Sequence, residues 1–337
     1  MRNNLSFTVL GSGRWGTSMA IYLASVGLRT TLFCPNEAKY RAITENRRNP
    51  VLPEQEIPDN LEINSDLSAS IKNLDVLVVS TPVIYLRSML SELTATEKFS
   101  KKTLILGINK GIERDTLQIP PQICKDFFPM NPYAHLGGPC FPAGLIEEGR
   151  PAAETLASDD YDKGLEIQEL ISSPWFRIYL SRDVNGVAYV GALKNVYAIA
   201  AGILEGLNLN EEAMSILVTR ALSEMRRFCK YMLIPDETLF GLSGLGDLTL
   251  TCYSGKSSHN KTFGKLFVEC DDLDSINQRM GNSIAEGYYT TASTQNLCEK
   301  FRIDMPIVSA VYQILYEGLS PKSALLDLMN RPLKMED

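Results

Sequence analysis

Histidine is nearly absent from this sequence: of 337 residues, only His135 and His259 carry an imidazole. The seven cysteines are scattered, odd in number and never arranged as C-x-x-C. Zinc and other transition-metal centres are built from clustered histidine and cysteine, and disulfide frameworks from cysteine pairs. We therefore expect no metal site and no disulfide scaffold. Scattered thiols are typical of a reducing compartment, so a cytoplasmic location is the default.

The sequence also lacks an excess of basic charge and a long uninterrupted apolar run. Lysine and arginine number 33 against 40 acidic residues, without a clustered basic face, which disfavours nucleic acid as a partner. The opening stretch MRNNLSFTVLGSG enters a strand pattern with no secretory signal ahead of it. The weakly charged run 184–204 is interrupted by Asn185, Lys194 and Asn195, which disfavours a membrane span. We expect small-molecule partners and no membrane insertion.

The first half of the chain alternates short β-branched runs with helical patterns. Continuous apolar runs such as 74–82 and 102–111 are typical of parallel strands buried on both faces. A helix is expected over 14–26, and further strands over 6–11, 29–34 and 175–181. This alternation predicts an α/β doubly wound, mostly parallel sheet.

After about residue 183 the pattern becomes helical, with glycine and proline between the segments. Helices are expected over 187–206, 211–231, 236–242, 260–269, 290–301 and 306–317. The polar stretch 271–282 is interpreted as a connection. We therefore divide the chain into an α/β domain, 1–183, and an all-helical domain, 184–337.

The turn after the first strand carries the G-x-G-x-x-G pattern of a dinucleotide site. In VLGSGRWGTSMA, Gly11 makes the tight turn, Gly13 lets the backbone approach a diphosphate, and Gly16 permits close helix–strand packing. The motif follows a strand and opens a helix, which is the context that gives it meaning. The sequence therefore predicts NAD or NADP as cofactor.

The choice between the two cofactors stays open. An NAD site usually has an acid near the end of strand 2, but the stretch LFCPNE places Glu37 one or two positions late. Arg41, Arg47 and Arg48 follow, and any of them could meet a 2′-phosphate.

Three other segments have compositions suited to a ligand. Lys110 follows a buried strand, at the edge where doubly wound sheets bind ligands. The loop 137–144 is rich in glycine and proline and suits backbone contacts. Hydroxyls, an amide and cations gather in 254–261, as a phosphate group would need. Each segment taken alone could equally be an ordinary surface loop or turn.

Lys194 is the only charged residue between Asp183 and Glu205. At helical spacing its neighbours Gly191, Ala198, Ala201 and Gly202 form a strip of small residues that lets another backbone approach. A desolvated ammonium gives up its proton more readily, which suits proton transfer. Asp247 is the candidate partner. The alternatives are a lysine that reaches solvent and a purely structural pair with Asp247.

In their order along the chain, these segments resemble the bacterial NAD(P)-dependent glycerol-3-phosphate dehydrogenases. The similarity rests on GSGRWGTSMA, ENRRNPVLP, NKGIE, GGPCFPAG, GALKNVYAIAAGI, GLSGLGDLTLTC and EGYYTTAS. It implies a Rossmann-type domain followed by an all-α domain like the C-terminal domain of 6-phosphogluconate dehydrogenase. It also implies reduction of dihydroxyacetone phosphate to sn-glycerol 3-phosphate with NADH or NADPH, for phospholipid synthesis.

The resemblance also implies roles for individual residues. Lys194 would be the acid/base lysine, and Lys110 would contact both substrate and cofactor. Asp247, Asn195 and Thr251 would order the proton-transfer site. The remaining substrate contacts would be Gly138, Cys140, Ser258, His259 and Asn260. The cofactor contacts would be Gly11, Ser12, Gly13, Arg14, Trp15, Gly16, Pro142, His259, Ile284 and Glu286.

Some positions depart from the family pattern. Cys140 stands where serine or threonine is usual, Pro142 where alanine is usual, and His259 where arginine is usual. The proline lacks a backbone N–H, and the histidine is a titratable cation in place of a fixed one. We expect these changes to alter substrate affinity and to leave activity intact.

Two alternatives compete with this interpretation. A related two-domain hydroxyacid or ketopantoate-type dehydrogenase would need an arginine to clamp a carboxylate, and neither 184–206 nor 241–264 contains one. A dinucleotide-binding sensor without catalysis would have no need for Lys194 with Lys110 and Asp247. A homodimer through the helical domain is a further expectation.

Overall fold

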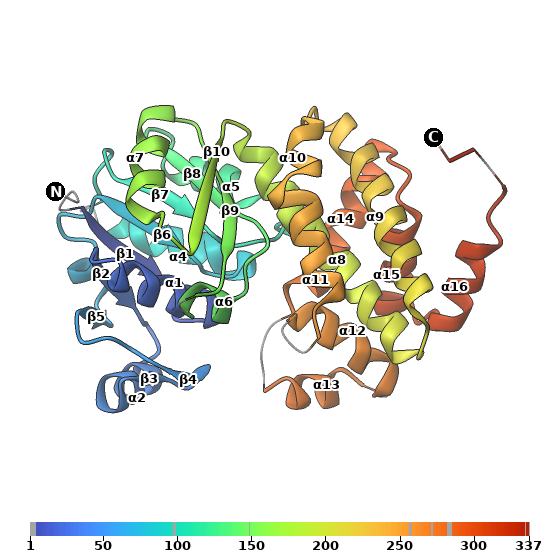
Figure 1. Cartoon of the computed structure of the whole chain (residues 1–337), viewed down its shortest axis with the longest axis horizontal. Helices are drawn as coiled ribbons and strands as arrows, with labels where there is room; N and C mark the ends of the chain where they lie inside the picture. Colours follow the sequence, from blue (N-terminus) through green and yellow to red (C-terminus); the bar gives the residue numbers. More distant parts are fainter. Residues whose placement is uncertain are drawn as a thin grey trace. The chain divides into compact units, whose positions relative to one another are not determined.

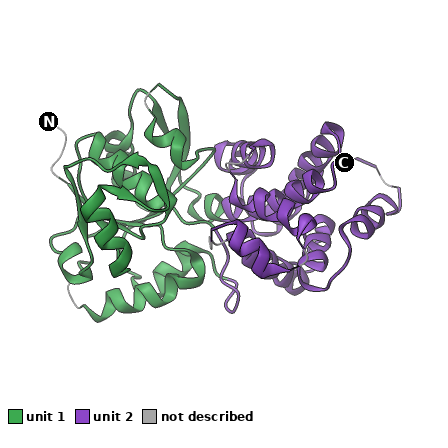
Figure 2. Cartoon of the chain, turned by 90° about the horizontal axis from the view of Figure 1, so that it is seen from below, with its two compact units in different colours: residues 1–110, 118–188 green, residues 111–117, 189–337 purple. Residues whose placement is uncertain are grey.

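The computed structural model describes residues 5–96, 99–147, 149–255, 258–270, 272–281, 285–333, 335 and 336. The chain forms two compact units, one of residues 1–110 and 118–188, the other of residues 111–117 and 189–337 (Figure 2). The short segment 111–117 thus belongs to the second unit, although its neighbours in sequence belong to the first. There the Ser293 hydroxyl donates a hydrogen bond of 2.9 Å to the Ile112 carbonyl.

The first unit is built on an eight-stranded sheet with the order β10-β9-β8-β7-β6-β1-β2-β5 (Figure 1). Every pairing is parallel except β8 with β9, which confirms the mostly parallel sheet. Its strands are β1 (Ser6–Leu10), β2 (Arg29–Phe33), β5 (Leu61–Asn64), β6 (Val76–Val79), β7 (Leu104–Gly107), β8 (Tyr133–Gly137), β9 (Ala152–Ser158) and β10 (Phe176–Ser181). A separate hairpin pairs β3 (Arg48–Asn49) with β4 (Leu52–Glu56).

Helices pack on both faces of the sheet. Alternate residues of β6 enter two different cores: Val76 and Val78 pack with α1 and α7, and Leu77 and Val79 pack with α4 and α5. This is why the strands appear in the sequence as continuous apolar runs. The helices are α1 (Arg14–Ser25), α2 (Glu37–Asn46), α3 (Leu67–Ser70), α4 (Val83–Ala95), α5 (Pro120–Phe127), α6 (Pro142–Ile146) and α7 (Tyr161–Ile171).

The strand order reverses direction between β1 and β6, since the chain builds outward on either side of this pair. In doubly wound sheets, ligands bind beyond the carboxyl ends of the strands at such a switch point. The glycine-rich turn after β1 lies at this position, and Ser80, directly after β6, touches it.

The described residues of the second unit contain helices and no strand, as expected from the sequence. The helices are α8 (Val184–Gly206), α9 (Glu211–Tyr231), α10 (Asp236–Phe240), the π-helix η1 (Leu242–Gly246), α11 (Asp247–Tyr253), α12 (His259–Glu269), α13 (Leu273–Arg279), α14 (Glu286–Phe301), α15 (Pro306–Tyr316) and α16 (Pro321–Met329). The first turn of α8, up to residue 188, belongs to the first unit. The interpretation of 271–282 as a connection was wrong, because α13 forms there. Asp272 caps it by accepting from the Ser275 N–H at 2.7 Å.

Helix α8 is the core helix of this unit. By length and composition alone α8 could cross a membrane, but 94% of its most apolar 18-residue stretch is buried inside the protein. Its small residues let α12 come close: a Cβ on Gly202 would lie 1.9 Å from the Lys261 carbonyl, and one on Gly264 2.1 Å from the Ile199 carbonyl. The strip of small residues around Lys194 therefore allows a helix–helix contact at backbone distance.

Candidate functional site

The turn from β1 into α1 is shaped by its three glycines. Gly11 has φ +116°, which favours glycine, and a Cβ on Gly16 would lie 2.1 Å from the Gly11 carbonyl. Among the described residues, nothing lies within 4 Å of the Cβ position of Gly13, so the space above the turn is open. The first N–H groups of α1 start here. This combination fits the diphosphate of NAD or NADP.

Asn49 holds this turn by hydrogen bonds, and the sequence analysis did not identify it. Its fully buried amide nitrogen donates hydrogen bonds to the Ser12 carbonyl at 3.0 Å and to the Thr17 hydroxyl at 2.7 Å. Arg14, one of the predicted cofactor residues, donates to the Val51 carbonyl at 2.7 Å in the loop between β3 and β4. Asn49 belongs to ENRRNPVLP, a stretch that contributed to the resemblance and in which only the arginines had been considered as ligand contacts.

The basic residues after strand β2 are bonded to protein groups. Arg41 pairs with Glu37 at 2.8 Å, Arg48 pairs with Glu56 at 3.2 Å, and Arg47 donates to the Leu61 carbonyl at 3.2 Å. Each of the three arginines named as a candidate for a 2′-phosphate therefore has a partner within the first unit.

Most of the other predicted residues of the first unit follow β7 or β8, and Trp15 lies in α1. Lys110 is the third residue after β7 and is half-buried. Gly138 follows β8 and accepts a 2.9 Å hydrogen bond from the Cys140 N–H. Pro142 begins α6, a position at which the missing N–H has no helical partner to lose. Trp15 is half-buried against the core of this unit.

His135 lies buried in β8, next to Tyr133. The Tyr133 hydroxyl is 3.1 Å from Nδ1, and a Cβ on Gly107 would lie 2.7 Å from the same nitrogen. Burial, with the Lys110 charge as a smaller cause, lowers the pKa of His135 to about 3. The imidazole is therefore neutral at physiological pH.

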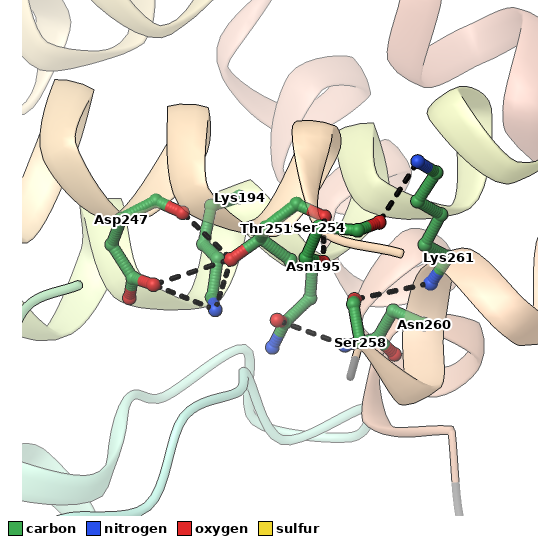
Figure 3. A network of polar contacts seen from close by, with 8 residues as sticks. All are labelled: Lys194, Asn195, Asp247, Thr251, Ser254, Ser258, Asn260 and Lys261. Atoms are coloured by element: carbon green, nitrogen blue, oxygen red, sulfur yellow. Dashed lines mark hydrogen bonds and ion pairs between the residues drawn. The ribbon is translucent and has the colours of Figure 1, made fainter. Parts of the chain in front are cut away.

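In the second unit, Lys194 is held by two groups of α11 (Figure 3). Its Nζ lies 2.9 Å from Asp247 Oδ1 and 2.7 Å from Thr251 Oγ1. The Lys194 and Asp247 side chains are 8% and 2% exposed. Asp247 and Thr251 are four residues apart and share a helix face, and the Thr251 hydroxyl is also 2.6 Å from the Asp247 carbonyl. The result is a desolvated ammonium with a fixed anionic partner.

The π-helix η1 brings α11 to this place. It is one tight turn, LSGLG, in which a Cβ on Gly244 would lie 2.0 Å from the Leu239 carbonyl. Only glycine fits there, and Asp247 is the residue that ends it. π-Helical turns are frequent at functional sites.

Asn195 and Asn260 are joined beside the lysine. The Asn260 amide nitrogen donates to Asn195 Oδ1 at 2.9 Å, and Asn260 Oδ1 accepts from the Gly287 N–H at 2.8 Å. Asn195 is 3% exposed. Figure 3 shows the Lys194 and Asn195 side chains pointing to the same side of α8.

The start of α12 carries the residues predicted for a phosphate. Ser258 caps the helix by accepting from the Lys261 N–H at 3.3 Å, and His259 is its exposed first residue. Lys261 is 7% exposed, and its ammonium lies 3.1 Å from Glu205 and 2.9 Å from the Ser254 carbonyl. Lys261 is thus hydrogen-bonded to both Ser254 and Ser258. Glu286 begins α14, while Ile284, Lys256 and Ser257 lie outside the described residues.

Two family models match the chain. The model described as "NAD-dependent glycerol-3-phosphate dehydrogenase N-terminus" covers residues 6–163, and the model for the C-terminus of the same enzyme covers residues 183–326. The curated relatives include two bacterial proteins named glycerol-3-phosphate dehydrogenase, NAD(P)+. The one from Solidesulfovibrio magneticus is 37% identical over 98% of this chain and all of its own length. The one from Leptospira biflexa is 36% identical over 97% and 98%.

Solved structures agree. The crystal structure of glycerol-3-phosphate dehydrogenase from Coxiella burnetii is 30% identical, with a TM-score of 0.91 over 97% of this chain and 99% of its own. A ketopantoate reductase from Ralstonia eutropha, at 13% identity and a TM-score of 0.62 over 95% of this chain and all of its own, shares the fold alone. The comparisons therefore favour the glycerol-3-phosphate dehydrogenase interpretation over the ketopantoate-type alternative.

Proposed function

The chain belongs to the NAD-dependent glycerol-3-phosphate dehydrogenase family, and we propose that it reduces dihydroxyacetone phosphate to sn-glycerol 3-phosphate with NADH or NADPH. The observation that carries this proposal is the buried ammonium of Lys194, held by Asp247 at 2.9 Å and Thr251 at 2.7 Å. A charge in so apolar a helix is costly unless it is paired, and a paired, positioned ammonium is a proton donor.

The reduced nicotinamide, when bound, supplies the hydride that adds to the carbonyl carbon. Lys194 then donates a proton from Nζ to the carbonyl oxygen, so that the ketone becomes a secondary alcohol. Its charge also stabilises the negative charge that develops on that oxygen. Asp247 and Thr251 hold Nζ in place, and in the reverse direction the lysine takes the proton back.

The other predicted residues are assigned on the same basis. Ser258, His259 and Asn260, at the start of α12, would bind the substrate phosphate, as a helix N-terminus favours an anion. Lys110, Gly138 and Cys140 would be further substrate contacts. The cofactor contacts would be Gly11, Ser12, Gly13, Arg14, Trp15, Gly16, Lys110, Pro142, His259, Ile284 and Glu286.

We place the enzyme in the cytoplasm, where its product would enter phospholipid synthesis. The cytoplasmic location is supported by the seven cysteines, which are scattered, odd in number and without a C-x-x-C pair, a pattern typical of a reducing compartment. A homodimer remains part of the proposal, and light scattering coupled to size exclusion would measure it.

The test follows the absorbance of NADH and of NADPH with dihydroxyacetone phosphate, and with ketopantoate as the competing substrate. We expect oxidation with dihydroxyacetone phosphate, and its loss in Lys194→Met. The matched control is Lys300→Met, because Lys300 is exposed in the last turn of α14. Failure of the wild type with both cofactors would sink the proposal, and comparing the cofactors decides between NAD and NADP.

A further inference from the structure

Gly287 has no role in the function proposed above, yet its backbone touches the site. It is the second residue of α14, where the helix has no partner of its own for the N–H group. That N–H donates to Asn260 Oδ1 at 2.8 Å. A Cβ here would lie 2.7 Å from the Asn195 carbonyl, 2.8 Å from Asn260 Oδ1 and 2.9 Å from Ile199 Cδ1. The contact is therefore available to glycine alone.

A backbone N–H can only donate, so this hydrogen bond determines which end of the Asn260 amide is oxygen. The nitrogen end then faces Asn195 and donates to Asn195 Oδ1 at 2.9 Å. Because that oxygen is engaged as an acceptor, the amide nitrogen of Asn195 is turned away from Asn260. The direction of every donor in this chain of hydrogen bonds follows from the Gly287 N–H.

We propose that Gly287 is a positioning residue: through Asn260 it sets the orientation of the Asn195 amide, so that an N–H donor, and not a carbonyl, is presented beside Lys194 to the substrate oxygen. This inference rests on the proposed carbonyl reduction. A donor there stabilises the oxyanion that develops as the hydride adds, whereas a carbonyl oxygen would repel it. This chain of hydrogen bonds from Gly287 through Asn260 to Asn195, the relay, thus selects substrates that place an oxygen acceptor at the Lys194 ammonium.

The first test is a double-mutant cycle between Asn260 and Asn195. In Asn260→Asp the carboxylate still accepts from Gly287 but cannot donate, so the Asn195 amide must reverse. We expect kcat for dihydroxyacetone phosphate to fall by roughly 10²- to 10³-fold, the range for losing one oxyanion donor. Asn195→Ala should cost a similar factor. The double variant should lie within about threefold of Asn195→Ala, because the relay acts through Asn195.

kcat is the readout because repulsion between the introduced carboxylate and the substrate phosphate would raise KM. Asn210→Asp is the control for an added charge, since Asn210 caps α9 by accepting from Ala213 at 3.2 Å and is exposed. NADH binding and thermal unfolding report folding. If Asn260→Asp fails to fold, Gly287→Ala replaces it, since its methyl group displaces the Asn260 amide without adding charge.

An undiminished kcat in Asn260→Asp overturns the relay. So does a double variant whose loss is the product of the two single losses, because Asn260 would then act independently of Asn195. A wild type that oxidises neither cofactor overturns the proposed function instead, which separates the two failures.

Discussion

The buried ion pair of Lys194 and Asp247 allows a quantitative test of the site. Lys194→Met removes the cation and leaves a carboxylate that is 2% exposed, and Asp247→Asn removes the anion and leaves an ammonium that is 8% exposed. Removing one partner of a buried pair costs about 3–5 kcal/mol, because the other charge remains without compensation. The double variant removes both charges and should regain most of that loss.

These energies convert to large shifts in unfolding temperature. At roughly 2–4 °C per kcal/mol for a unit of this size, each single variant should unfold about 6–20 °C below the wild type. All three variants should lack activity, since each removes the proposed proton donor or the carboxylate that holds it. Circular dichroism melts and urea unfolding measure the stability, and NADH oxidation measures the activity.

The control is the exposed pair of Arg226 and Asp236, which lie 3.3 Å apart with side chains about half exposed. Such pairs contribute about 0–1 kcal/mol, so Arg226→Met and Asp236→Asn should barely change the melt. The reasoning is refuted if the Lys194 and Asp247 variants behave like this control. It is also refuted if the double variant loses the sum of the two single losses.

Three further predictions concern the glycine-rich turn and two buried titratable residues. Gly16→Ala places a methyl 2.1 Å from the Gly11 carbonyl, so NADH affinity measured by fluorescence titration should fall by at least about tenfold, and unchanged affinity would contradict the prediction. Burial raises the pKa of Glu224 from 4.5 to about 7, so the folded protein holds a proton that the unfolded chain has lost, and about 3 kcal/mol of stability should disappear as pH rises from 4.5 to 7. Urea unfolding of Glu224→Gln should lack this fall, and a slope identical to wild type would contradict it. For His135 the pH dependence has the opposite sign, because burial lowers its pKa from 6.5 to about 3 in the folded protein. About 5 kcal/mol of stability should therefore be lost as pH falls from 6.5 to 3, and urea unfolding of His135→Gln should lack this loss.

Patterns within a few residues of each other were predictable. The apolar runs of β6 and β7, the glycine-rich turn after β1 and the long helix around Lys194 depend on local spacing, and local spacing is what a sequence displays. The same is true of the small residues on α8, which predicted the close approach of another backbone. The mostly parallel sheet and the helical second half followed from the order of these elements.

Contacts between distant segments were decided only by tertiary packing. Lys194 and Asp247 are 53 residues apart, and the sequence could name the pair but not its 2.9 Å geometry, which depends on η1 and α11. Asn49 and Gly287 were missed for the same reason. A buried asparagine looks like a loop residue, and a glycine N–H has no side chain to signal it. The proposed proton donor, Lys194, was visible in the sequence because a lone charge in an apolar helix is locally anomalous. Its supporting hydrogen bonds were not visible, because each joins residues that only the fold brings together.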